Sequence, residues 1–272
     1  MYFSRLHELT TARGRLCVGL DPQPSVLDAW GLPHDVNGVE HCVRQTVAAL
    51  GELVAVFKPQ SGFFEPFGSR GIAVLERVLA DISAAGALSL LDVKRGDIGS
   101  TMGGYAQAYL ADGSPLAADA ITVSPYLGFE SLRPAINAAS TSGRGLYVLA
   151  RTSNPEGQSV QLARGEDGRT VAQSVIDAAA AENTASGSNS IGLVVGGTHH
   201  DLGVDLRWFN ASILVPGIGA QGGRIKDLRT IFGPALPHVL PSVSREVLNQ
   251  GPDPARLKAA VERLIAEWRE VS

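Results

Sequence analysis

Eight short runs of apolar residues recur along the chain, with helical segments between them. Continuous Val, Ile and Leu runs of this length are typical of strands buried on both faces, and such strands occur in parallel sheets. The pattern therefore predicts eight parallel strands. They are expected at LCVGL (16–20), LVAVFK (53–58), ALSLLD (87–92), DAITVS (119–124), GLYVLA (145–150), IGLVVG (191–196), SILVPG (212–217) and HVLPSV (238–243).

Two of the intervening segments, and the segment that follows the last run, have the periodicity of amphipathic helices. In 70–86 and 101–111 apolar residues return every three or four positions, and Gly86 ends the first of these segments as a stop signal. The segment 254–268 opens with Pro254, a residue favoured in the first turn of a helix, and predicts a closing helix.

The alternation of strands and helices predicts an α/β fold, a (β/α)8 TIM barrel formed by a single domain over residues 1–272. No linker rich in Pro, Ser or Gly divides the chain. The polar stretches 154–170 and 185–190 are expected to be long loops, because strand-like runs continue beyond both. An open doubly wound sheet uses the same alternation and is the alternative.

The composition argues against two classes of protein, those that bind nucleic acid and those that span a membrane. The formal net charge is −4 and no run is rich in Lys or Arg, so the chain lacks the electrostatic footprint of a protein that binds nucleic acid. No segment approaches the length of a membrane span, and Arg5, His7 and Glu8 stand where a signal peptide needs apolar residues. We expect a cytoplasmic protein in which Cys17 and Cys42 are small buried hydrophobes rather than disulfide or metal partners.

Charged residues gather where the predicted strands end. Asp21, Lys58 and Asp92 close three of the apolar runs, and Lys94 and Asp97 follow the third. Active sites of barrels lie at the carboxyl ends of the strands, so these groups are expected to converge on one mouth. A single Asp–Lys pair is most simply an internal salt bridge. An array of this size, in which desolvation costs about as much as the ion pairs gain, indicates chemistry rather than stability.

A second group of candidates follows the last two strands. The loop PGIGAQGG (216–223) has glycines that let its backbone approach an anion closely, and Arg245 comes directly after the eighth strand. Barrels often hold a phosphate between these two loops, so we predict a phosphate site with Arg245 and Gln221 as donors. A tight connection between strand and helix is the alternative for the glycines alone.

Two further motifs carry less weight. His199 and His200 are adjacent, so their side chains diverge, and only Asp201 is near as a further ligand; we therefore expect no metal there. The aromatic residues of FFEPF (63–67) are expected to pack a loop over the rim of the barrel rather than to stack on a ligand.

The segment LLDVKRGDIGST (90–101) resembles the orotidine 5'-phosphate decarboxylase family, which carries Asp-x-Lys-x-x-Asp-Ile. The resemblance is closest to the longer bacterial branch of that family, and it covers most of the chain. Matching stretches occur in the family's order. They are GLDPQP around Asp21, FKPQSGFF around Lys58, ARTSNP around Ser153, VPGIGAQGG around Gln221 and SVSRE around Arg245.

The resemblance implies a decarboxylase without a cofactor or metal, which converts orotidine 5'-phosphate to UMP in the last step of de novo pyrimidine biosynthesis. Lys94 would then protonate C6 of the pyrimidine, and Asp92 would lie against the departing carboxylate. Lys58 would hold Asp92 and the ribose, and Asp21 would bind a ribose hydroxyl. Further substrate contacts would come from Ser153 at the pyrimidine, from Gln221 and Arg245 at the phosphate, and from Pro216.

The resemblance also implies a homodimer. Asp97, with Ile98 and Thr101, would reach into the site of the neighbouring subunit. It assigns no role to Arg95. The last strand ends in PSVS (241–244) rather than the more usual glycine-rich turn, which leaves backbone contacts to the phosphate unassigned.

Chemistry argued from the residues agrees with these roles. Loss of CO2 leaves negative charge on a ring carbon, and a preorganised ammonium such as that of Lys94 stabilises this charge more than it stabilises the substrate. The nearest alternative is a Mg²⁺-dependent sugar-phosphate decarboxylase or aldolase of the same superfamily, in which an acidic residue stands where this chain has Lys58. A catalytically silent barrel that senses a nucleotide is a second alternative.

Overall fold

The computed structural model describes residues 1–272 and contains a closed barrel of eight parallel strands in sequence order. Each predicted run overlaps one strand, and the pairing of β1 with β8, which joins Cys17 to Ser242, excludes an open sheet. The (β/α)8 prediction is confirmed. The strands are β1 (Cys17–Leu20), β2 (Val56–Pro59), β3 (Leu88–Arg95), β4 (Ala120–Val123), β5 (Gly145–Arg151), β6 (Ile191–Val195), β7 (Ile213–Val215) and β8 (Val239–Val243).

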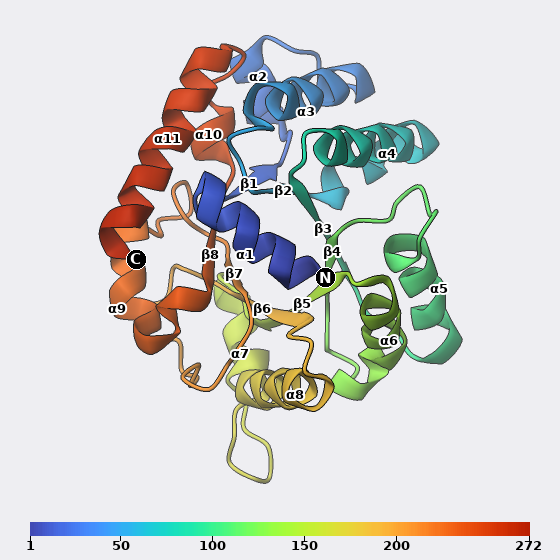
Figure 1. Cartoon of the computed structure of the whole chain (residues 1–272), viewed down its shortest axis with the longest axis vertical. Coiled ribbons are helices and arrows are strands. Elements are labelled where there is room, and N and C mark those ends of the chain that lie inside the picture. Colours follow the sequence, from blue (N-terminus) through green and yellow to red (C-terminus); the bar gives the residue numbers. More distant parts are fainter.

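Helices surround the barrel, as Figure 1 shows. The α-helices are α1 (Tyr2–Arg13), α2 (Pro24–Trp30), α3 (Val36–Leu50), α4 (Gly68–Ala84), α5 (Gly99–Leu110), α6 (Arg133–Ser142), α7 (Gln158–Gln161), α8 (Val171–Ser186), α9 (Leu228–Phe232), α10 (Arg245–Leu248) and α11 (Pro254–Val271). Short 3-10 helices are η1 (Ser61–Phe63), η2 (Glu65–Phe67), η3 (Phe129–Leu132), η4 (Pro155–Gly157), η5 (Ile225–Asp227) and η6 (Gly233–His238). No helix is long and apolar enough to cross a membrane.

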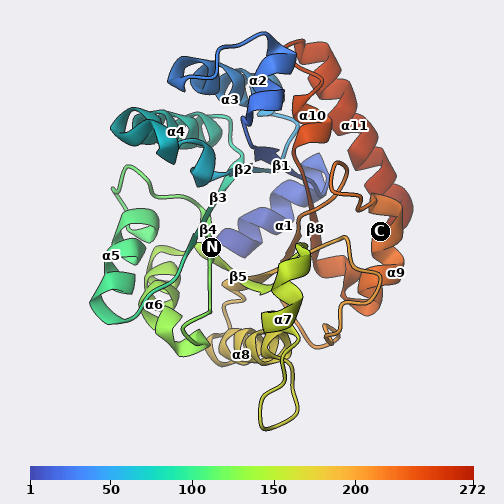
Figure 2. The same cartoon turned by 180° about the vertical axis from the view of Figure 1, so that it is seen from behind.

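Helix α1 covers the amino-terminal end of the barrel and crosses it in the view of Figure 1. Its residues Tyr2 and Leu6 are buried against the inward-facing side chains of the strands. The Tyr2 and Tyr147 hydroxyls lie 3.3 Å apart, and Tyr147 donates a hydrogen bond of 2.9 Å to Ser212 Oγ. One end of the barrel is therefore covered. Figure 2 shows the opposite end, with α7 in front of the strands.

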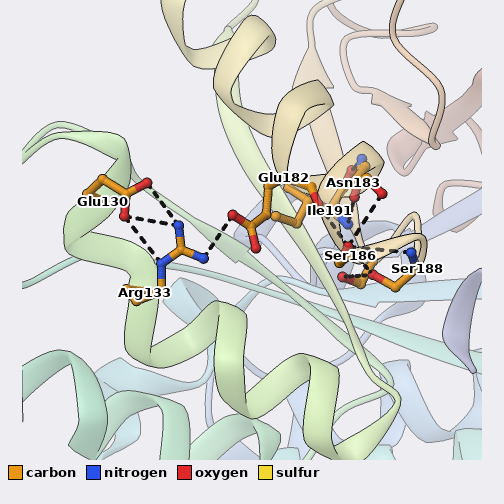
Figure 3. A network of polar contacts seen from close by, with 8 residues as sticks. Glu130, Arg133, Glu182, Asn183, Ser186, Ser188 and Ile191 are labelled. Carbon is orange, nitrogen blue, oxygen red and sulfur yellow. Dashed lines mark hydrogen bonds and ion pairs between the residues drawn. The ribbon is translucent and has the colours of Figure 1, made fainter.

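A network of polar contacts ties α6 to α8 on the outside of the barrel (Figure 3). Arg133 of α6 forms ion pairs with Glu130 and, at 2.8 Å, with Glu182 of α8. The neighbouring Asn183 is buried, and its amide both donates to Ile191 O and accepts from Ile191 N, at 2.8 and 3.0 Å. These bonds satisfy the backbone at the start of β6.

Three local predictions need correction. Residues 185 and 186 belong to α8, which ends at Ser186 and is capped by Gly187 with φ 62, so only 187–190 is a loop. The stretch 154–170 contains η4, α7 and a bridge between Arg164 and Thr170. The connection from β6 to β7, residues 196–212, contains no helix. Cys17 and Cys42 are buried and free.

Candidate active site

A pocket of about 560 Å³ opens where the carboxyl ends of the strands meet, and its size suits a small-molecule ligand. The strand order places the ends of β1, β2, β3, β5, β7 and β8 around it. The structure thus brings most of the sequence-predicted site residues to one place. Those that line the pocket are Asp21, Lys58, Asp92, Lys94, Ser153, Pro216, Gln221 and Arg245.

At one side of the pocket four charged groups meet. The Nζ of Lys58 donates to Asp92 Oδ2 at 3.0 Å and lies 3.9 Å from Asp21 Oδ1. The Nζ of Lys94 donates to the other carboxylate oxygen of Asp92 at 2.6 Å. Asp92 therefore lies between two ammonium groups, which gives the buried carboxylate the partners that its desolvation requires.

The charges of this cluster shift the pKa values of Lys58 and Asp92, its two buried members. Burial lowers the pKa of Lys58, but the carboxylates of Asp92 and Asp21 raise it by more, so the pKa lies above its usual value. Burial raises the pKa of Asp92, but the ammonium groups of Lys58 and Lys94 hold it well below its usual range. The pair is thus ionised over the whole neutral range.

Two neutral side chains, which the sequence analysis did not single out, complete the surroundings of Asp92. Thr122 Oγ1 donates to Asp92 Oδ1 at 2.8 Å and accepts from the backbone N–H of Lys94 at 2.9 Å. Gln60 Nε2 donates to Asp92 Oδ2 at 3.1 Å. The available signals were a polar residue inside the apolar run 119–124 and an amide two positions after Lys58.

The backbone at Lys94 has an unusual conformation. Strand β3 continues past the predicted end at Asp92 to Arg95, and its register against β4 shifts between Leu91 and Arg95. Within this irregular stretch Lys94 has φ 46, which costs a residue with a side chain about 1–2 kcal/mol. Strain of this kind is kept only where the surroundings fix it, and it concentrates at functional sites.

The opposite side of the pocket is formed by the loops after β7 and β8. Gly217, Gly219 and Gly222 have φ 94, 80 and 96, so the loop takes a path that other residues rarely adopt. Gln221 Oε1 accepts from Ser153 Oγ at 3.2 Å, which joins this loop to the end of β5. Arg245 begins α10 and faces the pocket, and none of the chain's ion pairs or side-chain hydrogen bonds includes its guanidinium.

Two further pocket atoms are buried without a hydrogen-bond partner. They are Asp21 Oδ1 and Ser244 Oγ. A buried polar atom without a partner is costly, because it has lost water and gained nothing in exchange. The site thus offers a ligand one carboxylate acceptor in Asp21, one hydroxyl in Ser244 and one guanidinium in Arg245. These groups suit a ligand that carries hydroxyl and anionic groups.

Three predicted residues do not line the pocket of their own chain. Asp97 Oδ1 accepts from the backbone N–H of Ile98 at 2.8 Å. The Ile98 side chain is 63% exposed, and Thr101 is exposed in the first turn of α5. The neighbouring loop after β4 exposes two large apolar residues, Tyr126 at 81% and Leu127 at 52%. These side chains lie outside the pocket and follow the neighbouring strands β3 and β4.

The aromatic prediction for 63–67 holds only in part. Phe64 is fully buried and Phe67 packs against the core, but Phe63 lines the pocket, since η1 follows β2 directly at the mouth. The long segment after Ser153 also forms part of the wall, through Asn154, Gly157 and Gln161.

The adjacent histidines do not gather ligands. His199 Nε2 lies 2.8 Å from Thr152 O, which orients its ring toward the backbone. No group of three or more His, Cys, Asp and Glu side chains is arranged to hold a metal ion.

A larger groove of about 1,010 Å³ lies outside the barrel, between α3, α4 and α11. Three of its charged residues are paired with one another: Arg44 donates to Asp81 at 2.6 Å and to Glu40 at 3.3 Å. Because it lies away from the carboxyl ends of the strands, where barrel active sites occur, it is not the candidate site.

The comparisons with known proteins agree on one family. A model described as "Orotidine 5'-phosphate decarboxylase / HUMPS family" matches residues 14–260. Orotidine 5'-phosphate decarboxylase of Salinispora arenicola (strain CNS-205) is 55% identical over 98% of this chain and 96% of its own length.

Solved structures extend this likeness. A putative orotidine 5'-phosphate decarboxylase from Streptomyces avermitilis matches with a TM-score of 0.95 and 54% identity, over 99% of this chain and 95% of its own. Leishmania donovani OMP decarboxylase matches with a TM-score of 0.78 and 31% identity, over 98% and 99% of the two chains. The chain belongs to the orotidine 5'-phosphate decarboxylase / HUMPS family.

Proposed function

We propose that this chain decarboxylates orotidine 5'-phosphate to UMP and CO2, the last step of de novo pyrimidine biosynthesis, without a cofactor. The observation that carries the proposal is the arrangement of one pocket: the ammonium of Lys94 lies 2.6 Å from Asp92 at one side, and the unpartnered guanidinium of Arg245 stands at the other. A phosphorylated substrate can then be held at one end while charge develops at the other.

The remaining pocket residues fit the parts of a nucleotide. Arg245 and the amide of Gln221 would bind the phosphate, and Pro216 lies in the same loop. Asp21 Oδ1, which has no hydrogen bond within the protein, would accept from a ribose hydroxyl, with Lys58 beside it. Ser153, held by Gln221, would contact the pyrimidine.

The reaction breaks the bond between C6 and the carboxylate carbon, and the electron pair stays on C6 as CO2 leaves. Lys94 would stabilise this carbanion and then deliver a proton to it, which gives UMP. Asp92, ionised because of its two ammonium neighbours, would repel the substrate carboxylate, and this repulsion disappears as CO2 departs.

The surroundings of Asp92 favour this reaction over that of the metal-dependent relatives. A Mg²⁺ site needs oxygen ligands, and here the ammonium of Lys58 occupies the space between Asp21 and Asp92. A cation in that position repels a second cation.

We also propose a homodimer in which Asp97, Ile98 and Thr101 of one copy complete the pocket of the other. All three lie outside their own pocket, and the exposed Tyr126 and Leu127 on the adjoining loop supply apolar surface for such a contact. A cytoplasmic location remains our prediction.

A spectrophotometric assay with orotidine 5'-phosphate, run with and without EDTA, tests the reaction. We expect substrate loss and UMP formation at the same rate in both. Binding of UMP without any consumption of orotidine 5'-phosphate would indicate the silent sensor. Activity on a sugar phosphate that EDTA abolishes would instead indicate the metal-dependent class.

Mixing two inactive variants tests the shared site. Lys94→Ala and Asp97→Ala chains that exchange at random should restore about a quarter of the sites, because each mixed dimer holds one pocket with both residues intact. Mixed dimers that form but stay inactive would reject the proposal.

A further inference from the structure

Arg95 follows Lys94 directly, but its side chain lies on the other side of β3, away from the pocket. Its Nη2 donates to Glu65 Oε1 at 2.9 Å and to the Tyr109 hydroxyl at 3.2 Å. Its guanidinium carbon lies 5.5 Å from the ring centroid of Tyr105 and 5.7 Å from that of Tyr109, both on α5. Two aromatic faces and a carboxylate thus hold this guanidinium.

Glu65 connects this contact to a second part of the pocket wall. Its Oε1 also accepts from Ser61 Oγ at 2.5 Å, at the start of η1. Gln60, the residue just before η1, donates to Asp92, and Phe63 in η1 lines the pocket. The Arg95–Glu65 pair therefore joins the end of β3 to the segment that positions Gln60.

The backbone of Lys94 needs support of this kind. With φ 46 it is in a region that side chains disfavour, and a free strand end would relax from it. Thr122 Oγ1 holds the Lys94 N–H on one side, and the N–H of Ser124 donates to Arg95 O at 2.8 Å on the other. These two bonds hold the backbone before and after the Lys94–Arg95 peptide, and the anchored Arg95 side chain holds the same stretch from outside the barrel.

We propose that Arg95 is the positioning residue of Lys94: clamped by Glu65, Tyr105 and Tyr109, it keeps the strained end of β3 in the conformation that points the Lys94 ammonium at Asp92. The expected fall in kcat rests on the proposed decarboxylase function. The expected displacement of the Lys94 side chain does not depend on that function. A small displacement of a reacting group is enough to cost a large part of the rate.

The test compares Arg95→Met with Arg44→Met. The control removes an arginine that also bridges two elements, α3 and α4, but lies on the outside of the barrel. We expect Arg95→Met to lower kcat by about 10–100-fold, with KM and the Kd of UMP within about 3-fold of wild type. Arg44→Met should leave all three unchanged, even if its melting temperature falls as much.

A readout without turnover separates this inference from the proposed function. The chain has only four lysines, Lys58, Lys94, Lys226 and Lys258, so selective ¹³C labelling of lysine gives a spectrum that single Lys→Arg variants can assign. Arg95→Met should shift the side-chain resonance of Lys94 and leave those of Lys226 and Lys258 in place. Arg44→Met should shift neither Lys94 nor Lys58.

An unmoved Lys94 resonance in Arg95→Met, or a kcat within about 3-fold of wild type, would overturn the proposal. If Arg95→Met does not fold, Glu65→Gln replaces it, because it weakens the clamp without removing a side chain. We expect the same shift, with a smaller fall in kcat of about 3–10-fold. Arg95→Lys, which keeps the charge but loses the planar fork, should recover only part of the rate.

Discussion

The two sides of the pocket satisfy their charges in opposite ways. On the side of β2 and β3, Lys58, Asp92 and Lys94 are bound to one another at 3.0 and 2.6 Å. On the side of β7 and β8, Arg245 has no partner in the protein. Asp21 stands between the two patterns, with one oxygen 3.9 Å from Lys58 and without a hydrogen bond.

This difference indicates that the two sides of the pocket have different roles, one in transition-state stabilisation and the other in substrate binding. Charges already fixed by their neighbours need no reorganisation when a reaction begins, which is the condition for electrostatic stabilisation of a transition state. A cation without a partner gains its hydrogen bonds only when an anion arrives, so it contributes binding energy. We therefore expect the side of β2 and β3 to carry out the chemistry and the side of β7 and β8 to supply binding energy.

The largest effect that this comparison predicts is that of Lys94→Ala. Loss of the ammonium removes both the charge beside C6 and the proposed proton donor, so turnover should fall by at least about 1,000-fold. UMP should still bind, because the opposite side of the pocket is untouched. Steady-state assays and UMP titration measure the two effects, with the exposed Lys226→Ala as the control. Turnover near the wild-type rate would remove Lys94 from the chemistry.

Arg245→Gln should show the reverse pattern. The change removes a charged fork from the phosphate side, so KM for orotidine 5'-phosphate should rise by about 10–100-fold. Activity on orotidine, which has no phosphate, should be the same for the variant and the wild type. If kcat fell in this variant while KM stayed constant, Arg245 would act in the chemical step. That result would contradict the assignment of the β7 and β8 side to substrate binding.

Thr122→Val tests the side of β2 and β3 more finely. The hydroxyl joins Asp92 Oδ1 to the backbone of Lys94, and valine keeps its shape without these bonds. We expect kcat to fall by about 5–10-fold, with little change in KM. Thr46→Val is a matched control, since Thr46 is equally buried but bonds only within α3. Equal kinetics for both variants would show that Asp92 and Lys94 hold their positions without Thr122.

Thr122 also shows where sequence reasoning stops. The eight strands could be predicted because strands buried on both faces leave continuous apolar runs, and the charged residues at their ends were visible as exceptions to that pattern. The bonds of Thr122 and Gln60 to Asp92 depend on the register between neighbouring strands, including the bridge between Gln60 and Asp92. No periodicity within one segment reports that register.

The conformation of Lys94 is a second example. A strand residue with φ 46 follows from the register shift between β3 and β4 and from the anchoring of Arg95, and both are tertiary features. The absence of a helix between β6 and β7 was not predicted either, because the alternation of strands and helices along the whole chain favours a helix in each connection. Elements were predictable from local patterns, and the contacts that position the site were not.

The smallest effect predicted here concerns stability and pH. The pKa of Asp92 in the folded protein lies below the unfolded value of about 3.9, so its ionised form contributes its full stability above that pH and loses it as the pH falls toward the lowered pKa. The pKa of Lys58 lies above the unfolded value of about 10.4, so its contribution is complete below that pH and is lost only as the pH rises through the raised pKa.

Urea unfolding of wild type and Asp92→Asn from pH 2 to 9 measures the first of these contributions. The difference in free energy of unfolding should be constant from about pH 5 to 9 and should shrink below about pH 4, where the wild-type carboxylate must be protonated on unfolding. A difference that stayed constant down to pH 2 would mean that Lys58 and Lys94 do not stabilise the charge of Asp92. The side of β2 and β3 would then hold its charges no more firmly than the side of Arg245.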